Sequence, residues 1–366
     1  MSAAYAYLDH NATSPLRPAA LDAMVEALRA GGNPSSVHRP GRAARARIEI
    51  ARRQVASLVG ALPAEVVFTS GGSEANNMAL RGSGRRRVLV SSIEHESVLK
   101  PVPDAERIAV DANGVVDLGM VERRLAGEPA VVSVMLANNE TGVIQPVAEV
   151  VRVARAAGAL VHCDAVQAAG KVAVDLHGLG VDYLSLSAHK LGGPSGVGAL
   201  IVRAGAPFAS DRLGGGQESY RRAGTENVAG IAGFGAAAEA SHDGLDAALR
   251  DRLEASLPMA KVHGAAAPRL PNTSCLSMPG VSAETQVMAL DLAGIGVSAG
   301  SACSSGKVTR SAVLSAMGVE PALAEAAIRI SCGWNTVSED IDCLIAAWKG
   351  LYIRVTHSDL SQARAA

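Results

Sequence analysis

The stretch of sequence that decides the fold is Tyr183-Leu184-Ser185-Leu186-Ser187-Ala188-His189-Lys190-Leu191-Gly192-Gly193-Pro194. Its apolar first half predicts a buried strand, and the Gly-Gly-Pro run at its end predicts a tight turn. A lysine held by such a turn at the mouth of a strand is placed to form a Schiff base with an aldehyde cofactor. The alternative is a surface lysine after an edge strand. The Schiff-base role is favoured because none of the other five lysines follows an apolar strand-like run with a hydroxyl and an imidazole beside it.

The bulk composition narrows the class of protein. The chain has 366 residues, of which 48% are hydrophobic and 19% charged, so we expect a sizeable core and one large domain with a smaller one. A net charge of −1 and an aromatic content of 3% argue against nucleic acid or an anionic membrane as the main partner. No apolar run reaches about 18 residues and no signal peptide pattern opens the chain, so we expect no membrane segment.

The cysteines indicate a reducing environment. There are five, an odd number, at wide spacing and without a Cys-x-x-Cys pair. This pattern disfavours a disulfide framework or a self-contained zinc site and favours the cytoplasm.

Along the first 250 residues, short apolar runs alternate with helical patterns, which predicts a mostly parallel α/β sheet with helices on both sides. The runs are continuous rather than alternating, as is typical of strands buried on both faces. The expected strands are Val66–Thr69, Arg87–Ser91, Val131–Leu136, Leu160–Cys163, Tyr183–Ser187 and Gly198–Val202. The expected helices are Pro18–Ala30, Arg42–Val59, Glu74–Arg81, Val147–Ala157, Val228–Ala240 and Leu245–Leu257.

After these helices the pattern changes, and we expect a smaller α+β domain. Its strands are predicted at Thr273–Met278 and Ile328–Cys332, and its helices at Glu284–Leu292 and Glu339–Lys349. The last residues, 355–366, are polar and are expected to be frayed and flexible.

Two further motifs carry chemistry. In the first, the strand ending at Thr69 runs into Gly71-Gly72, and Ser73 opens a helix, an arrangement that binds phosphate. Its alternative is a plain turn in which Ser73 caps the helix. In the second, Asp164 ends a buried apolar strand, where a carboxylate is costly unless paired. A protonated pyridine nitrogen would be a suitable partner, and Gln167 could reach the same ring. The alternative is that Asp164 caps the next helix.

The order of these signals matters more than each signal alone. An anion loop, a strand-end aspartate and a strand-end lysine follow one another, and Lys190 comes 26 residues after Asp164, which leaves room for one helix and one strand. This is the linear arrangement of a type-I pyridoxal phosphate fold.

With these motifs in place, the chain resembles the cysteine desulfurases of group I, the NifS/IscS-like branch of the class-V aminotransferases. The matching segments run almost end to end and are highly specific: Tyr7–Thr13, Gly32–Ser36 with His38 and Gly41, Phe68–Gly71, Glu94–Val98, Asn138–Gly142, Asp164–Gln167, Ser187–Lys190, Gly214–Glu218, Arg222–Asn227, Ser301–Ser305 and Ile328–Ser331. The resemblance implies a type-I fold with a mostly parallel seven-stranded sheet flanked by helices and a smaller α+β domain. It also implies a large domain over residues 15–257 and a small domain made of 1–14 and 258–366.

The resemblance further implies how pyridoxal 5'-phosphate would be held. Lys190 would hold the cofactor covalently, Asp164 would pair with the pyridine nitrogen, and His95 would stack on the ring and handle protons. Hydrogen bonds near the ring hydroxyl would come from Gln167 and Asn139. The phosphate would be held by a set of small and polar residues: Gly72, Ser73, Ser187 and His189, with Thr225 supplied by a neighbouring subunit. That sharing implies a homodimer with a common active site.

Arg329 would take the carboxylate of the substrate as a bidentate clamp, with Asn33 nearby. Cys303 would set the subtype of the reaction. Its surroundings, Ser298–Gly306, are small and polar, so this loop is expected to be exposed and mobile. A thiol there reaches inward to a substrate and outward to a protein acceptor, whereas an accidental exposed cysteine is the alternative.

The implied activity is removal of sulfur from L-cysteine, which leaves L-alanine and a persulfide on Cys303. The sulfur would pass to an iron–sulfur scaffold or another acceptor protein, and Cys303 could ligate iron during transfer; no intrinsic metal is expected. The other cysteines are interpreted as structural. Three alternatives stay open: a selenocysteine lyase, another class-V aminotransferase, and a non-enzymatic sulfur or metal carrier.

Overall fold

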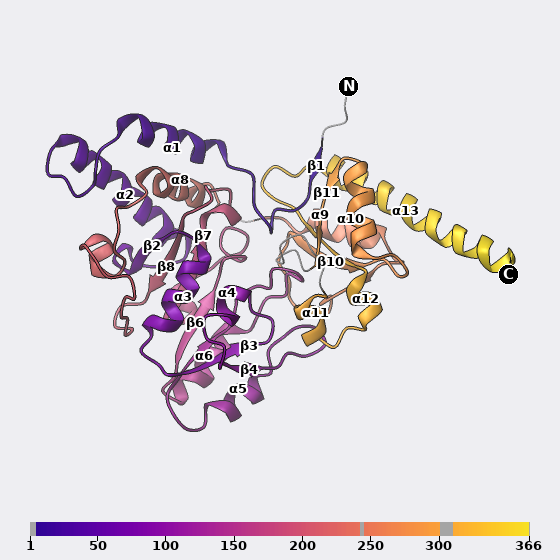
Figure 1. Ribbon diagram of the computed structural model, residues 1–366, viewed down its shortest axis with the longest axis horizontal. Coiled ribbons are helices and arrows are strands. Elements are labelled where there is room, and N and C mark those ends of the chain that lie inside the picture. The colour runs from indigo at the N-terminus through magenta and orange to yellow at the C-terminus, as the bar shows by residue number, and fades with distance from the viewer. Residues whose placement is uncertain (1–4, 242–244, 301–309, 366) are drawn as a thin grey trace.

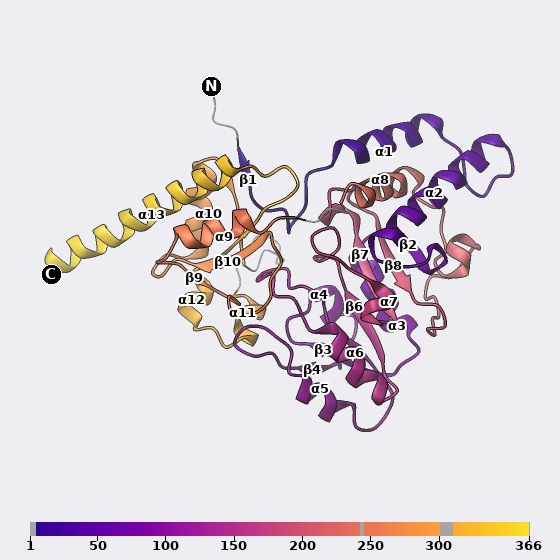
Figure 2. The ribbon, with the colours of Figure 1, turned by 180° about the vertical axis from the view of Figure 1, so that it is seen from behind.

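The computed structural model describes residues 5–241, 245–300 and 310–365, with only the backbone of 356–365. Two groups of elements lie side by side: one is built around a large sheet and contains most of the chain up to about residue 240, and the other contains the C-terminal third (Figure 1). Seen from behind, the same two groups remain separate, and the N-terminal strand lies with the C-terminal group (Figure 2).

The large sheet has seven strands in the described residues. Their order is β2 (Val66–Thr69), β8 (Gly198–Val202), β7 (Tyr183–Ser187), β6 (Leu160–Asp164), β5 (Ala130–Ser133), β3 (Arg87–Ser91) and β4 (Glu106–Ile108). Only β8 is antiparallel, and it runs against both of its neighbours. The prediction of a mostly parallel seven-stranded sheet is therefore confirmed, although the short edge strand β4 was not located from the sequence.

Both faces of this sheet are covered, as the continuous apolar runs predicted. In β2, Val66 and Phe68 join the main core cluster, whereas Val67, between them, joins a second cluster on the opposite face. Helices that contribute to the main cluster are α2 (Arg39–Leu58), α5 (Leu118–Leu125), α6 (Val147–Ala156), α7 (Leu176–Leu179) and α8 (Val228–Glu239), and α1 (Pro18–Ala30) packs on α8. Helices α3 (Gly72–Gly82) and α4 (Glu96–Leu99) cover the other face.

Element bounds agree closely with the predictions, and one difference is informative. The run Val131–Leu136 was predicted as one strand, but β5 ends at Ser133. The amides of Val134 and Leu136 still bond to β6, whereas that of Met135 donates to the Glu94 carboxylate, 2.7 Å away. A side chain replaces the next strand partner there, so the ladder stops while the chain continues toward the edge of the sheet.

The smaller group is built on a four-stranded antiparallel sheet in the order β12 (Ser298–Ala299), β13 (Ala327–Ser331), β10 (Thr273–Ser277) and β9 (Lys261–Val262). Its helices are α9 (Ala248–Ser256), α10 (Ala283–Leu292), α11 (Ala312–Ala316), α12 (Pro321–Glu325) and α13 (Ser338–Ala365). Trp348 of α13 is fully buried in the core of this group. The prediction of a smaller α+β unit is confirmed.

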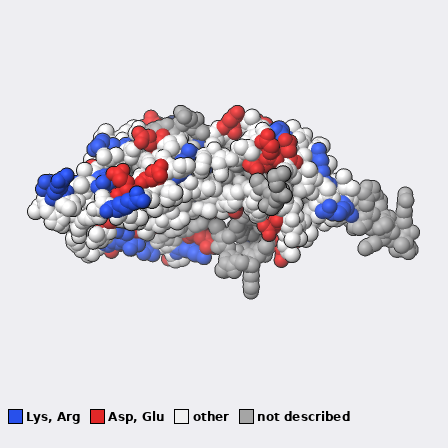
Figure 3. Space-filling model, turned by 90° about the horizontal axis from the view of Figure 1, so that it is seen from above, with Lys and Arg blue, Asp and Glu red and all other residues white. Residues whose placement is uncertain are grey.

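The N-terminal segment pairs with strands of this smaller group. Strand β1 (Ala6–Tyr7) pairs with β11 (Ile295–Gly296), and Asp9 bridges to Ser331. Helix α13 runs on to Ala365, beyond the predicted end at Lys349 and through residues expected to be frayed, because no proline interrupts it. The division of the chain at residues 15 and 258 stays a prediction. Seen from above, acidic and basic side chains are scattered over one face without a large area of one sign (Figure 3).

Candidate active site

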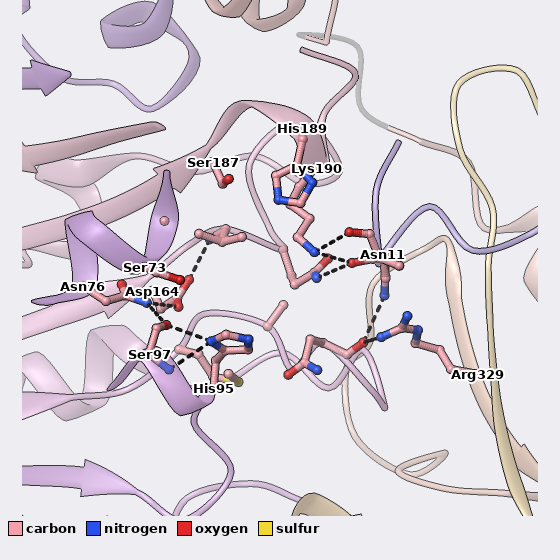
Figure 4. A pocket seen from close by; sticks show the side chains of 17 residues that line it. Asn11, Ser73, Asn76, His95, Ser97, Asp164, Ser187, His189, Lys190 and Arg329 are labelled. Atoms are coloured by element: carbon pink, nitrogen blue, oxygen red, sulfur yellow. Dashed lines mark hydrogen bonds between the residues drawn. The ribbon is translucent and has the colours of Figure 1, made fainter. Parts of the chain in front are cut away.

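A cavity of about 320 Å³ lies at the carboxyl edge of the large sheet, between it and the smaller group (Figure 4). Most of its lining follows the C-terminal ends of strands that run in one direction. β2 is followed by Gly72 and Ser73, β3 by His95 and β5 by Asn139. β6 ends at Asp164 and is followed by Gln167, and β7 ends at Ser187 and is followed by His189 and Lys190. Ligands of open α/β sheets bind at this edge, so the topology gathers the predicted side chains in one place.

Lys190 ends a short 3-10 helix, η2 (Ala188–Lys190), that begins directly after β7. Its amine donates to two backbone carbonyls of the N-terminal segment, Asn11 O at 2.7 Å and Ala12 O at 2.8 Å. Gly193 has no room for a side chain, because a Cβ there would come within 2.9 Å of the Ala188 Cβ. The tight turn that the sequence indicated therefore fixes where the lysine enters the cavity.

Asp164 does not cap a helix, because the residues after it form turns. Its Oδ1 accepts from the Val166 amide at 2.9 Å and its Oδ2 from the Asn76 side chain at 2.7 Å. Burial and the neighbouring Asp164 charge raise the pKa of Glu94 to about 8. The shift favours the protonated form of Glu94, and of the two carboxyl groups only Asp164 lines the cavity, where it can pair with a cation.

The Asn76 amide also orients His95. It donates to Ser97 Oγ at 2.9 Å, and Ser97 Oγ lies 2.8 Å from His95 Nδ1. The Ser97 backbone amide donates to the same Nδ1 at 3.1 Å. Because that amide can only donate, Nδ1 is an acceptor, and a neutral His95 ring carries its proton on Nε2.

The glycine-rich turn before α3 forms a second hollow of about 240 Å³, which shares Gly72, Ser73, Ser187 and His189 with the main cavity. The helix is capped by Gly71, at φ +153°, and not by Ser73. A Cβ on Gly72 would lie 2.8 Å from the Val166 side chain. The first helical hydrogen bond is made by the Ala75 amide, so the three amides of residues 72–74 make none within the helix and can donate to an anion.

Arg329 comes from β13 on the opposite side of the cavity. It is 3% exposed, and it donates to Asp9 Oδ1 at 2.7 Å and to Asn139 O at 3.0 Å. Its buried Nε–H has no partner among the described residues. Arg329 is thus held rigidly and keeps a donor for a ligand carboxylate.

Most predicted site residues are brought together: Gly72, Ser73, His95, Asn139, Asp164, Gln167, Ser187, His189, Lys190 and Arg329 all line the main cavity. Asn33 and Thr225 are exposed and do not line it in this single chain, so the roles predicted for them stay predictions. Cys303 lies outside the described residues. The chain that leads to it is placed beside the site, since Ser298 lies opposite Arg329 in the β12–β13 ladder.

Four functional candidates were given no role from the sequence: Asn11, Asn76, Ser97 and Lys171. Each makes hydrogen bonds to a predicted site residue. Asn11 and Ser97 lie in stretches already picked out as motifs, and Asn76 lies in the helix that Ser73 was predicted to open, so a polar residue in or beside such a motif was the available signal. Lys171 offered no such signal, because its importance comes from burial.

None of the described cysteines lines the main cavity. Cys163, Cys275 and Cys332 are buried free thiols, and burial raises the pKa of each, that of Cys332 to about 12. Cys343 is exposed on α13. No cluster of three or more His, Cys, Asp or Glu suited to a metal occurs in the described part of the chain. Nor does any helix there have the length and apolarity needed to span a bilayer.

Comparison with known proteins agrees with this geometry. The model of the class-V aminotransferase family matches residues 6–344. A cysteine desulfurase of Cereibacter sphaeroides is 46% identical over 361 residues, covering 93% of each chain. The crystal structure of a NifS-like protein from Rickettsia africae superposes with a TM-score of 0.87 at 34% identity, covering 95% of this chain and 99% of that one. A structure described as SspA in complex with cysteine gives 0.79 at 29% identity, covering 90% and 99%.

The family match, the high identity over nearly the whole length and the shared fold lead to one conclusion. The chain belongs to the class-V aminotransferases and, within them, to the NifS/IscS-like cysteine desulfurases.

Proposed function

We propose that the protein uses pyridoxal 5'-phosphate to take sulfur from L-cysteine, releasing L-alanine and carrying the sulfur as a persulfide on Cys303. The observation that supports this proposal most strongly is that Lys190, Asp164, the start of α3 and Arg329 all line one cavity. These groups are an amine for an aldehyde, a carboxylate for a ring cation, an anion site and a carboxylate clamp.

The residues present fit this cofactor. The turn that opens α3 requires glycine at position 72, because a Cβ there would meet the Val166 side chain, and its first amides can donate to a phosphate. The cavity volume of about 320 Å³ lies within the range of cofactor sites. Lys190 would hold the aldehyde carbon, Asp164 the pyridine nitrogen, and Gln167 and Asn139 the ring oxygen. The phosphate would lie against the group formed by Gly72, Ser73, Ser187 and His189, with the partner subunit's Thr225.

When bound, pyridoxal phosphate supplies an electron-withdrawing ring that stabilises negative charge on the substrate carbon. Arg329 orients L-cysteine through its carboxylate, and Asn33 would assist. Lys190 and His95, whose neutral ring carries its proton on Nε2, are the groups that accept and return protons at the substrate.

Sulfur transfer takes place in one nucleophilic displacement. The Cys303 thiolate forms an S–S bond with the substrate sulfur, and the C–S bond of the substrate breaks. The electron pair left on carbon takes a proton, which gives alanine. The persulfide then passes to an iron–sulfur scaffold or another acceptor protein, and a reducing compartment such as the cytoplasm keeps unpaired cysteines as thiols.

A homodimer is also part of the proposal. Thr225 is exposed and does not line the cavity of its own chain. The same stretch exposes Leu213 by 87% and Tyr220 by 81%. Apolar side chains exposed next to a predicted phosphate ligand support a second copy as their partner.

The test is to incubate the protein with L-cysteine and to measure alanine, sulfide and persulfide together. With a thiol reductant present to release the persulfide sulfur as sulfide, the wild type is expected to form alanine and sulfide in equal amounts, and Cys303→Ser is expected to keep the yellow cofactor but lose persulfide and sulfide. Cys343→Ser, which changes an exposed thiol elsewhere, serves as the control. Formation of a keto acid in place of alanine and sulfide would indicate an aminotransferase, and full sulfide release by Cys303→Ser would move the nucleophile to another residue.

A further inference from the structure

Lys171 is a buried lysine that the proposed reaction does not use. It lies in the turns after β6 and is 4% exposed. Its amine donates to Asn11 Oδ1 at 2.6 Å and to Gln167 Oε1 at 2.7 Å. Neither acceptor is charged, and Lys171 forms no ion pair among the described residues. Lysine is almost never fully buried without a charged partner, so this position calls for a reason.

The contacts of Lys171 lead to the catalytic lysine by a short route. The backbone carbonyl of Asn11 accepts from Lys190 Nζ at 2.7 Å and from Gln167 Nε2 at 3.0 Å. Lys171 and Lys190 also line one void of about 10 Å³ behind the main cavity. Both lysines therefore bond to Asn11: Lys171 to its side-chain oxygen and Lys190 to its backbone carbonyl.

These contacts fix which way the Gln167 amide faces. A lysine amine donates hydrogen bonds, so the oxygen of Gln167 must point toward Lys171. The nitrogen then points toward Asn11 O, and one of its two N–H groups is used there. Because Gln167 lines the cavity, the second N–H is left for an acceptor inside it. Without Lys171, only the Asn11 carbonyl would oppose a turn of the amide that presents its oxygen.

We propose that Lys171 is a positioning residue that acts on the bound cofactor through Gln167, by holding this amide so that an N–H and not the C=O meets the ring oxygen. The inference rests on the proposed function and deepens it. A carbonyl facing the ring oxygen would repel it, whereas an N–H donor stabilises negative charge there.

The charged amine of Lys171 can only donate and so enforces this orientation most strongly, and a neutral amine can still make both contacts. Burial, with the nearby Lys190 and Arg329 cations, lowers the pKa of Lys171 well below its ordinary value. A neutral amine still has two N–H groups, which suffice for Asn11 and Gln167. An anionic ligand in the cavity would favour the charged form and strengthen the same two bonds.

The test uses the visible spectrum of the cofactor-loaded protein, which reports on the ring directly. In Lys171→Met the pH midpoint of the yellow absorbance is expected to move upward by roughly one unit, the equivalent of one lost hydrogen bond. The direction follows because a donor to the ring oxygen favours the form that has given up its proton. Lys171→Gln retains a donor and is expected to shift less. Lys261→Met, on the exposed start of β9, is the control.

A double-mutant cycle separates positioning from simple support of the fold. Gln167→Leu alone is expected to shift the midpoint, and adding Lys171→Met to it is expected to shift it no further. An additive shift would show that Lys171 acts by another route and would overturn the inference, as would an unchanged midpoint in Lys171→Met. If that variant fails to fold, an unchanged midpoint in Lys171→Gln and in Gln167→Leu overturns it equally. A wild-type protein that binds no pyridoxal phosphate refutes the proposed function itself.

Discussion

The two sides of the cavity are built in different ways. On the side of the large sheet, each residue follows the end of a strand, and neighbouring strands bring Asp164 and Lys190 to one edge. On the other side, Arg329 projects from the four-stranded sheet, and Asn11 comes from the N-terminal segment that lies against it. The first side depends on strand topology, whereas the second depends on hydrogen bonds between residues far apart in the chain. The two sides should therefore respond differently to substitution.

The largest effect is expected on the sheet side, at Lys190. Lys190→Ala removes the amine proposed to hold the aldehyde, so activity should fall below detection. Treatment with borohydride followed by denaturation should leave no cofactor on the variant, whereas it should stay on the wild type. Lys100→Ala, at the exposed end of α4, is the matched control. Cofactor that remains attached to the variant would contradict the assignment of Lys190.

An intermediate effect is expected on the other side, at Arg329. Lysine keeps the charge but loses the planar pair of N–H donors, so Arg329→Lys should raise KM for L-cysteine about ten- to a hundredfold with a smaller change in kcat. Asp9→Asn weakens the ion pair that holds this guanidinium and should raise KM about tenfold or less. The measurement is steady-state alanine formation.

Arg269 offers a control for that experiment, because it is another arginine of the smaller group paired with a carboxylate, Glu254, at 2.6 Å. Arg269→Lys should leave KM unchanged. Equal changes in KM for the two variants would mean that Arg329 acts only through the stability of the smaller group.

The smallest effect is expected where the two sides meet, at Glu140. Its Oε2 accepts from Ser311 Oγ at 2.5 Å, and a Cβ on Gly300 would lie 3.2 Å from the same oxygen. Glu140 thus contacts residues on both flanks of the stretch that contains Cys303. Burial raises the pKa of Glu140 from 4.5 to about 7, although Ser311 and Arg329 oppose the shift.

A raised pKa means that the folded protein binds more protons than the unfolded chain between pH 4.5 and 7. The contribution of Glu140 to stability is therefore lost as pH rises through this window. Glu140→Gln should remove that part of the pH dependence of urea unfolding. Glu284→Gln, exposed on α10, should leave it in place. Identical pH profiles for the wild type and Glu140→Gln would contradict this assignment.

The same contrast explains what could be predicted from the sequence. Strands β2, β3, β7 and β8 have the predicted bounds, because continuous Val, Leu and Ile runs specify strands buried on both faces. Lys190 and Asp164 could be located because they directly end such runs. Lys171 could not, since its burial arises from contacts with Asn11, 160 residues away in sequence. Residues of that kind are visible only once the chain is folded.

One contact also bears on the order in which the site forms during synthesis. The Asn11 amide donates to the Ser331 hydroxyl, 320 residues further along, and β1 pairs with β11. Once the first 240 residues have been synthesised, every described strand of the large sheet has been made, and so have Asp164 and Lys190. The partners of the N-terminal segment, β11 and Ser331, have not been synthesised at that point. The nascent chain would thus assemble the proposed cofactor side of the cavity first, and would complete the proposed substrate side only after β13 has been made.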